Sequence, residues 1–190
     1  ILHRNLFAAE LGYKGADVAT VTIESAFSKE NRPIKKMYAG SMAYRSKFRT
    51  YPKLIDNLVR IASIHSDEPG IIHTVSHALA SDITESLRNQ VGGRAIEQLP
   101  RGFERTFAIQ RFLSGGFGPN AILVGPSLME GVDGADEACR WQAMAKAPWP
   151  HMKDPTVEYL MKHLDPKWAQ AWYNWKVTQT TVQGIGRVVR

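Results

Sequence analysis

The chain has 190 residues, of which 44% are hydrophobic, and it carries a formal net charge of +6. This content is enough for a packed core and argues against disorder, while the moderate basic charge favours a polyanionic partner without requiring one. The single cysteine, Cys139, excludes an internal disulfide framework and a cysteine-only zinc or iron–sulfur site, so we expect a small buried residue in a reducing compartment.

No apolar run approaches the roughly 18 residues of a membrane span. The first residues also lack the basic region and cleavage pattern of a signal peptide. We therefore expect a soluble protein with no membrane partner, in the cytoplasm or, in a eukaryote, in the nucleus. Because the chain begins without a methionine and ends inside its most suggestive motif, we expect it to be part of a longer protein.

Apolar runs without alternation predict buried parallel strands, and 3.6-residue apolar stripes predict helices between them. In chain order, the predicted elements are a strand at 19–24, a helix at 53–65, a strand at 70–75, helices at 77–89 and 102–113, a strand at 121–125 and a weaker strand at 140–148. Alternating strands and helices predict an α/β fold with a mostly parallel sheet and helices on both faces.

A long helix is predicted from Pro166 to the end of the chain, with Asp165 as its N-cap. Trp168, Trp172 and Trp175 follow at i, i+4 and i+7. This spacing suits a stacking platform for nucleobases, but it is more often the core face of a helix, which we expect here.

The closing stretch "TTVQGIGRVVR" places Gln183, Arg187 and Arg190 on one helical face. Gly184 and Gly186 each cost a helix about 1 kcal/mol, and they remove side chains beside that face so that a ligand can approach. Planar guanidinium groups suit a phosphate, although basic residues in a last turn also complement the helix dipole.

Polar residues follow the two apolar strands at 70–75 and 121–125, where ligands bind in open α/β sheets. Ser76 follows the first strand, and Glu130 and Asp133 follow the second. Hydroxyls and backbone N–H groups suit oxyanions, while carboxylates suit hydroxyls or an arginine. Equally, Ser76 suits a helix N-cap, and the two carboxylates suit a solvated loop.

Two segments together carry a family resemblance. "SLMEGVD" at 127–133 followed by "QGIGRVVR" at 183–190 resembles motifs V and VI of superfamily 2 helicases, in the XPD/DinG-like branch of DEAH-type DNA helicases. Further similar segments occur in order: "LFAAELGY" at 6–13, "ESAFSKENRPI" at 24–34, "GIIHTVSH" at 70–77 (motif IV) and "KAPWPHMKDP" at 146–155. The resemblance covers essentially residues 1–190 and implies the second RecA-like motor domain of an ATP-dependent DNA helicase.

The resemblance also implies roles for individual residues. Arg187 and Arg190, with Gln183 alongside, would reach the γ-phosphate of ATP in the cleft between two motor domains. A coupling loop would touch the nucleotide or the arginines on one side and DNA on the other, and single-stranded DNA would be held by phosphate contacts. The loop residues are Glu130, Gly131 and Asp133, and the DNA contacts are Thr74, Ser76 and Ser127.

Two departures from the family pattern stand out. The strand after motif V reads "RWQAMAKAP", where the family usually has aliphatic residues. No G-x-x-x-x-G-K-[ST] or DEAH-type box occurs. The first motor domain would precede Ile1, hold most of the ATP and Mg²⁺ site, and carry any iron–sulfur insertion. The chain alone would be inactive.

Other readings stay open from the residues. The chain could be a RecA-like nucleic-acid-binding module without a motor, or a metal phosphohydrolase using Glu130 and Asp133 as ligands. His73 and His77 straddle a strand-to-helix junction, so a zinc pair is not expected. Basic and aromatic residues alternate at 35–53, which suits single-stranded DNA or solvated charges over core aromatics.

Overall fold

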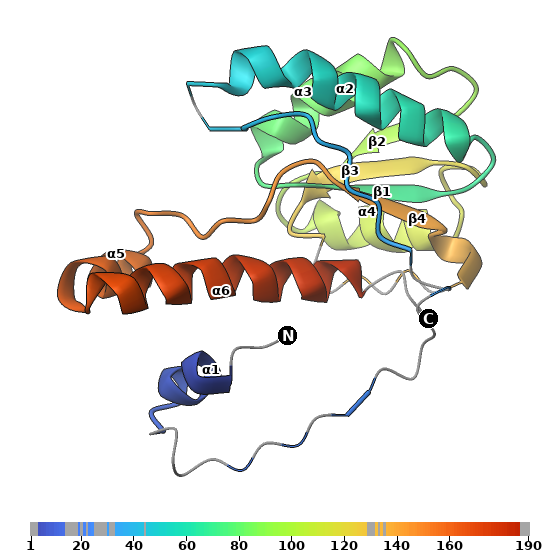
Figure 1. Cartoon of the computed structure of the whole chain (residues 1–190). Helices are drawn as coiled ribbons and strands as arrows, with labels where there is room; N and C mark the ends of the chain where they lie inside the picture. The colour runs from blue at the N-terminus through green and yellow to red at the C-terminus, as the bar shows by residue number, and fades with distance from the viewer. Residues whose placement is uncertain are drawn as a thin grey trace.

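The computed structural model describes residues 4–13, 19, 21, 23–24, 30, 33–43, 45–128, 132, 134 and 136–186. Its elements are α1 (Arg4–Glu10), α2 (Lys47–Ile64), β1 (Gly70–Thr74), α3 (His77–Arg88), β2 (Ile96–Gln98), α4 (Glu104–Leu113), β3 (Ile122–Pro126), a 3₁₀ turn (Asp136–Ala138), β4 (Trp141–Met144), α5 (Pro155–His163) and α6 (Pro166–Ile185). Figure 1 shows their arrangement.

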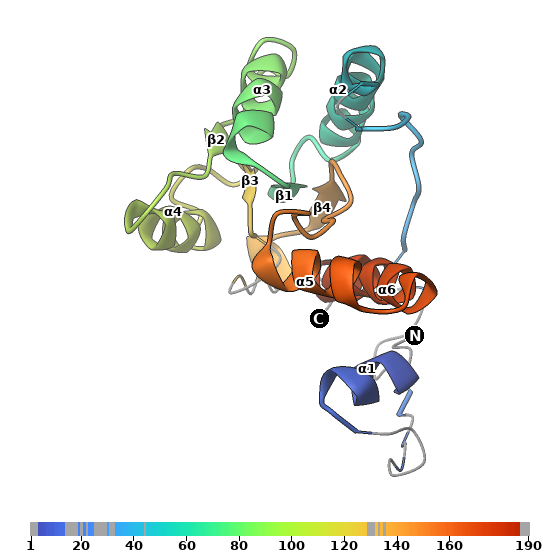
Figure 2. The ribbon, with the colours of Figure 1, turned by 90° about the vertical axis from the view of Figure 1, so that its left-hand side faces the viewer.

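All four strands pair in parallel, in the order β2-β3-β1-β4. Figure 2 shows α2 and α3 on one face of this sheet and α4 with α6 on the other. A packed core lies on each face: Ile72 and Val124 point toward α2 and α3, whereas Ile71 and Leu123 point toward α4. The alternation follows from the two-residue period of a strand. The predicted RecA-like α/β class, with a parallel sheet covered on both faces, is confirmed.

Most predicted elements are present with shifted ends. The strands at 70–75 and 121–125 correspond to β1 and β3, and the weaker strand at 140–148 is the shorter β4. The helix predicted from residue 53 begins six residues earlier, at Lys47, and it contains Pro52. The long C-terminal helix begins at Pro166 as predicted, and Asp165 accepts hydrogen bonds from the backbone N–H groups of Lys167 and Trp168. It was predicted to continue to the end of the chain, but it ends at Ile185 with Gly186 as its C-cap, and residues 187–190 lie outside the described residues.

The strand predicted at 19–24 is wrong for the residues described there. Ala19, Val21, Ile23 and Glu24 lie in no strand, and the side chains of Val21 and Ile23 are 83% and 86% exposed. Thr20 and Thr22 lie outside the described residues. An apolar, β-branched run forms a strand only when a neighbouring strand accepts its hydrogen bonds, and the described sheet is built from other segments.

The sequence pattern did not predict α1, β2, the 3₁₀ turn or α5. β2 has three residues, too few to show a period. α5 begins with the same Asp-Pro pair as α6, because Asp154 accepts from the N–H groups of Thr156 and Val157. The signal for α5 was therefore present in the sequence, as an Asp-Pro pair like the one that predicted α6.

Cys139 is buried, and its thiol lies within hydrogen-bond distance of the Trp141 carbonyl, 3.2 Å away. Burial raises the pKa of this thiol to about 12. The thiol is therefore protonated and unreactive at neutral pH, as expected for a small buried residue.

The tryptophans of α6 form part of a third core, as predicted. Trp172 and Trp175 are each 4% exposed and pack with Leu6 of α1 and Val157 of α5. The ammonium group of Lys176 lies over both rings and pairs with Glu10 of α1. These rings therefore join α1, α5 and α6 and are not a surface for nucleobases.

Candidate functional site

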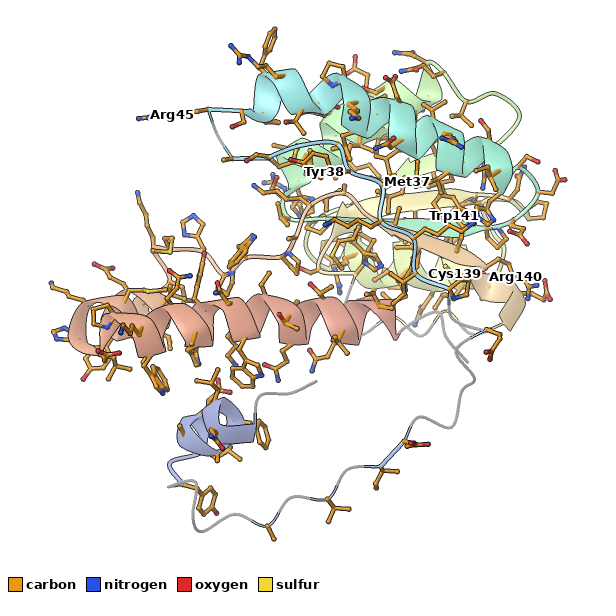
Figure 3. The ribbon with its side chains drawn as sticks, viewed as in Figure 1. Met37, Tyr38, Arg45, Cys139, Arg140 and Trp141 are labelled. Atoms are coloured by element: carbon orange, nitrogen blue, oxygen red, sulfur yellow. The ribbon has the colours of Figure 1, made fainter. Side chains whose placement is uncertain are left out.

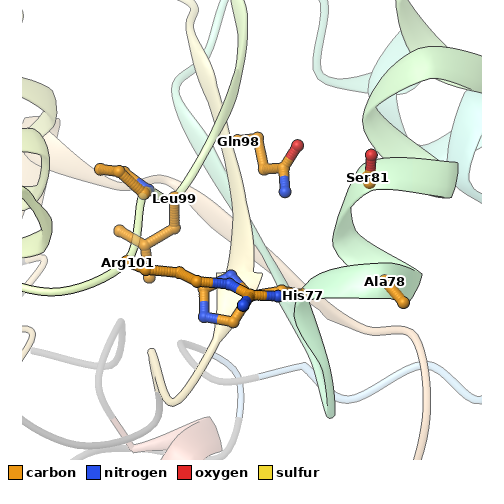
Figure 4. Close-up of a pocket in the computed structure, with 7 residues that line it drawn as sticks. His77, Ala78, Ser81, Gln98, Leu99 and Arg101 are labelled. Carbon is orange, nitrogen blue, oxygen red and sulfur yellow. The ribbon is translucent and has the colours of Figure 1, made fainter.

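The carboxyl ends of β1, β2 and β3 meet at one edge of the sheet, because the three strands are parallel neighbours. An open pocket of about 610 Å³ lies there and is lined in part by Ser76, His77, Arg101, Arg105 and Ser127. A second pocket of about 460 Å³ continues along α3 to Ser81 and Gln98. Figure 4 shows the side chains of His77 and Arg101 in this second pocket.

Ser76 begins α3. Its backbone is extended, and its Oγ accepts a hydrogen bond of 3.2 Å from the N–H of Leu79. The N-cap interpretation is therefore confirmed. The residue is exposed at the mouth of the pocket, so its hydroxyl hydrogen remains available to an anion.

Thr74 lies at the end of β1 and is buried. Its Oγ1 donates a hydrogen bond of 3.1 Å to the Ser76 carbonyl. The hydroxyl therefore shapes the strand-to-helix turn that presents Ser76. Its contact with a nucleic-acid phosphate stays a prediction.

Ser127 follows β3 with a φ of 56°, the only positive φ among the described residues other than glycine. This left-handed conformation is uncommon for a serine and costs on the order of 1–3 kcal/mol. The guanidinium of Arg105 donates a hydrogen bond of 2.7 Å to the Ser127 carbonyl and holds the turn in place. Strain of this kind is typical of functional loops.

The pocket carries positive charge. Arg101 is exposed and Arg105 is half-buried, and both lie beside the N-terminus of α3, whose backbone N–H groups favour anions. Burial lowers the pKa of His77, and the nearby charge of Arg101 lowers it further. Hydroxyls, guanidinium groups and a helix N-terminus together suit an anion such as a phosphate group.

Sequence reasoning missed Trp149, which lies in the loop after β4. Its ring is 45% exposed and borders a cavity of about 230 Å³ that Ser127 and Thr180 also line. Tyr173 of α6 packs against the ring with centroids 5.0 Å apart, and its hydroxyl donates to the Pro150 carbonyl. An exposed aromatic between two prolines, just past a strand's carboxyl end, was the available signal.

The residues predicted to serve the nucleotide lie mostly outside the described part of the chain. These are Glu130, Gly131, Asp133, Arg187 and Arg190. Gln183 is described and is exposed in the last turn of α6. Leu128 and Val132, the described residues next to these positions, are buried in the core cluster that includes Ile109 and Phe112 of α4. We call the edge lined by Ser76 and Ser127 the serine edge. Gln183 lines neither its 610 Å³ pocket nor the Trp149 cavity, although Thr180 of the same helix lines the Trp149 cavity.

The end of α6 contacts the sheet elsewhere. The side-chain amide of Gln142 in β4 donates a hydrogen bond of 2.6 Å to the carbonyl of Ile185, the last residue of α6. The same side chain contacts His73 of β1, with 2.8 Å between Oε1 and Nε2. His73 is therefore a hydrogen-bonded core residue. Among the described residues, no cluster of three or more His, Cys, Asp or Glu side chains is arranged to bind a metal ion.

The described aromatic residues of the basic stretch at 35–53 differ in exposure. Tyr51 is half-buried, with its hydroxyl 3.3 Å from that of Ser86, whereas Tyr38 and Phe48 are 70% and 90% exposed. Figure 3 shows Arg45 projecting away from the body of the protein. Core packing therefore explains only one of the described aromatics, and Tyr44 lies outside the described residues.

None of the helices in the described ranges is both long and apolar enough to span a bilayer.

A family model for the helicase C-terminal domain matches residues 58–190, which is more than half of the chain. No curated protein matches the chain. The matched range contains the parallel sheet, the serine edge and the closing arginine motif. The chain therefore belongs to the helicase C-terminal domain family, as its resemblance to XPD/DinG-like superfamily 2 helicases predicted.

Proposed function

We propose that this helicase motor domain works on single-stranded DNA, as the second RecA-like domain of an ATP-dependent helicase or translocase. The observation that carries the proposal is the serine edge: Ser76, Ser127, Arg101 and Arg105 line one open pocket at the carboxyl ends of the strands. Positive and hydroxyl-bearing side chains of this kind contact a phosphate backbone without reading its sequence.

The exposed ring of Trp149 completes the interface. It borders a cavity that shares Ser127 with the serine pocket, so a strand whose phosphates lie at the arginines could stack a base on the indole. Alternation of phosphate contacts and aromatic stacking is typical of proteins that bind single strands without sequence preference. From the family resemblance, we expect the protein to move along the DNA strand in the 5′-to-3′ direction.

The nucleotide would lie on a different side of the domain. Arg187 and Arg190, with Gln183, would stabilise the charge that develops on the γ-phosphate, while Glu130, Gly131 and Asp133 would couple that pocket to the strand. ATP and Mg²⁺ would be held mainly by a first motor domain preceding Ile1, and any iron–sulfur cluster would belong there too. Gln183 supports this arrangement, because it is exposed two residues before the end of α6.

ATP turnover tests the motor function. We expect a protein that contains both motor domains to hydrolyse ATP faster with single-stranded DNA, and the 190-residue chain alone to hydrolyse none, because its transition-state arginines then face no nucleotide. Phosphate release is measured with and without an oligothymidine strand. Mg²⁺-dependent turnover by the chain alone would favour a phosphohydrolase. DNA binding without turnover in the two-domain protein would favour a binding module.

Replacing Trp149 with alanine should weaken binding of an oligothymidine strand by about 5- to 150-fold, because stacking is worth about 1–3 kcal/mol per base. Fluorescence anisotropy of a labelled strand measures the dissociation constant. Trp149→Phe should keep much of the affinity. Tyr159→Ala removes an aromatic that is 60% exposed on α5 and serves as the matched control, with unchanged binding expected. Equal affinities for Trp149→Ala and wild type would remove Trp149 from the interface.

A further inference from the structure

Gln142 is a polar residue in β4, a short strand whose other members are Trp141, Ala143 and Met144. It lies in the second position of β4, half-buried, on the side of the sheet that faces α6. In the parallel register, Gln142 pairs with Ile71 of β1, so His73, two residues further on, projects from the same face. Both ends of the Gln142 amide are hydrogen-bonded, one to each neighbouring element.

The direction of these hydrogen bonds follows from the chemistry of the groups. The Ile185 carbonyl can only accept, so the NH₂ group of Gln142 must face it and the Oε1 atom must face His73. His73 therefore donates from Nε2. Its Nδ1 is buried without a hydrogen-bond partner, and burial lowers the pKa of the imidazole despite the opposing effect of Gln142. His73 is thus neutral and carries its proton on Nε2. The hydrogen bonds therefore run in one direction, from His73 to Gln142 and from Gln142 to Ile185.

The bond to Ile185 has a specific consequence for α6. The last carbonyls of a helix have no partner within the helix, and Ile185 is the final residue of α6. Gln142 supplies the missing donor from the sheet, 43 residues away in the chain. Figure 1 shows the end of α6 beneath β4, where this contact forms. The anchor therefore holds the backbone two residues before Arg187 in the sequence.

On its other side, Gln142 contacts His73, which lies in β1 close to the serine edge. His73 directly precedes Thr74, which bonds to the Ser76 carbonyl and borders the Trp149 cavity. A continuous path of contacts thus runs from the turn at Ser76, through β1 and Gln142, to the end of α6. Its members belong to three elements that meet only in the folded protein.

We propose that Gln142 is a positioning residue that ties the nucleic-acid edge of β1 to the last turn of α6, where the closing motif at 183–190 begins. The inference rests on the proposed motor function. Through the Ile185 carbonyl, Gln142 holds the last turn of α6, which carries Gln183, and through His73 it makes that turn sensitive to a strand bound at Ser76. Gln142 would not touch ATP or DNA. It acts by holding the groups that do.

The test compares Gln142→Met with wild type in the protein that contains both motor domains. Methionine keeps the length of the side chain and loses both hydrogen bonds. We expect kcat for DNA-stimulated ATP hydrolysis to fall about 10- to 100-fold, since small misplacements of catalytic groups have effects of this size. KM for ATP and the dissociation constant for an oligothymidine strand should stay near their wild-type values, while the melting temperature should fall by only a few degrees for the two lost hydrogen bonds. This separation of kcat from binding and stability is what a merely structural residue would not produce.

Two further measurements make the outcome decisive. Gln142→Glu keeps the acceptor for His73 but places an acceptor against the Ile185 carbonyl, so it should lose kcat like the methionine variant. Amide hydrogen exchange at 183–186 should accelerate in both variants while β1 stays protected, a readout independent of activity. Gln90→Met, at an exposed turn after α3, is the matched control and should leave turnover and exchange unchanged.

Wild-type kcat in Gln142→Met would overturn the coupling while leaving the motor function in place. A parallel loss of stability, DNA affinity and turnover would also overturn it, because Gln142 would then only support the fold. A two-domain protein whose turnover ignores DNA would overturn both the motor function and the coupling. In that case hydrogen exchange would still show whether Gln142 anchors α6.

Discussion

Replacing Arg187 with alanine is expected to lower DNA-stimulated ATP hydrolysis by about 10³-fold or more in a protein that contains both motor domains. An arginine finger stabilises negative charge that develops on the transferred phosphoryl group, and its contribution to kcat is about 10³ to 10⁵. Arg187 lies outside the described residues, so the prediction rests on the sequence motif and on α6, which carries the chain to Gly186. Steady-state turnover with saturating single-stranded DNA measures the loss.

Two control variants separate charge loss from a finger role. Arg60→Ala removes an exposed arginine on α2 and should leave turnover within about twofold, because exposed side chains away from a site contribute little. Arg187→Lys keeps the charge but loses the planar fork, so most of the activity should still disappear. DNA affinity should change little in either Arg187 variant. Turnover that survives Arg187→Ala would assign the finger role to another residue.

The second large effect concerns stability. Trp172→Ala should reduce the free energy of unfolding by about 3–5 kcal/mol, the usual cost of removing a large buried ring. Trp172 is 4% exposed and shares its cluster with Leu6, Val157 and Trp175, so alanine would leave a cavity where α1, α5 and α6 meet. The Lys176 ammonium would also lose one of its two aromatic neighbours. Urea unfolding of the 190-residue chain, followed by circular dichroism, measures the change.

The comparison with Trp149→Ala makes this result specific. Trp149 is 45% exposed, so its removal should affect stability less than DNA binding, whereas Trp172→Ala should do the opposite. A loss below about 1 kcal/mol for Trp172→Ala would contradict its place in the core. Trp168, Trp172 and Trp175 would then again be candidates for stacking nucleobases.

The fold class was readable from local patterns. Non-alternating apolar runs at β1 and β3 required cover on both faces, and the helical stripes of α2, α3 and α4 supplied it, which is the arrangement found. The run at 19–24 shows the limit of such reasoning. Its composition is that of a strand, but Val21 and Ile23 are exposed and lie in no strand. Composition alone does not make a strand, because a strand also needs a neighbouring strand to pair with.

The candidate site was partly readable. Ser76 and Ser127 follow predicted strands, and the structure brings them to one pocket, since parallel strands end at the same edge. Arg101, Arg105 and Trp149 were not found, although each lies close to a predicted element. Nothing in a local pattern tells which face of a loop an arginine covers, or that an aromatic between prolines borders a cavity lined by Thr180.

By itself, the sequence determined the parallel α/β class, the N-cap of α6 and the core role of its tryptophans, because each depends on residues close together in the chain. It also carried the helicase resemblance, which depends on the order of short motifs and not on their contacts in space. Only the tertiary structure decided the strand order β2-β3-β1-β4, the meeting of Arg105 with Ser127, and the contact between Gln142 and Ile185. These contacts join residues 22 and 43 positions apart. They form only when packing of the whole sheet and its helices brings distant segments together, so no local periodicity encodes them.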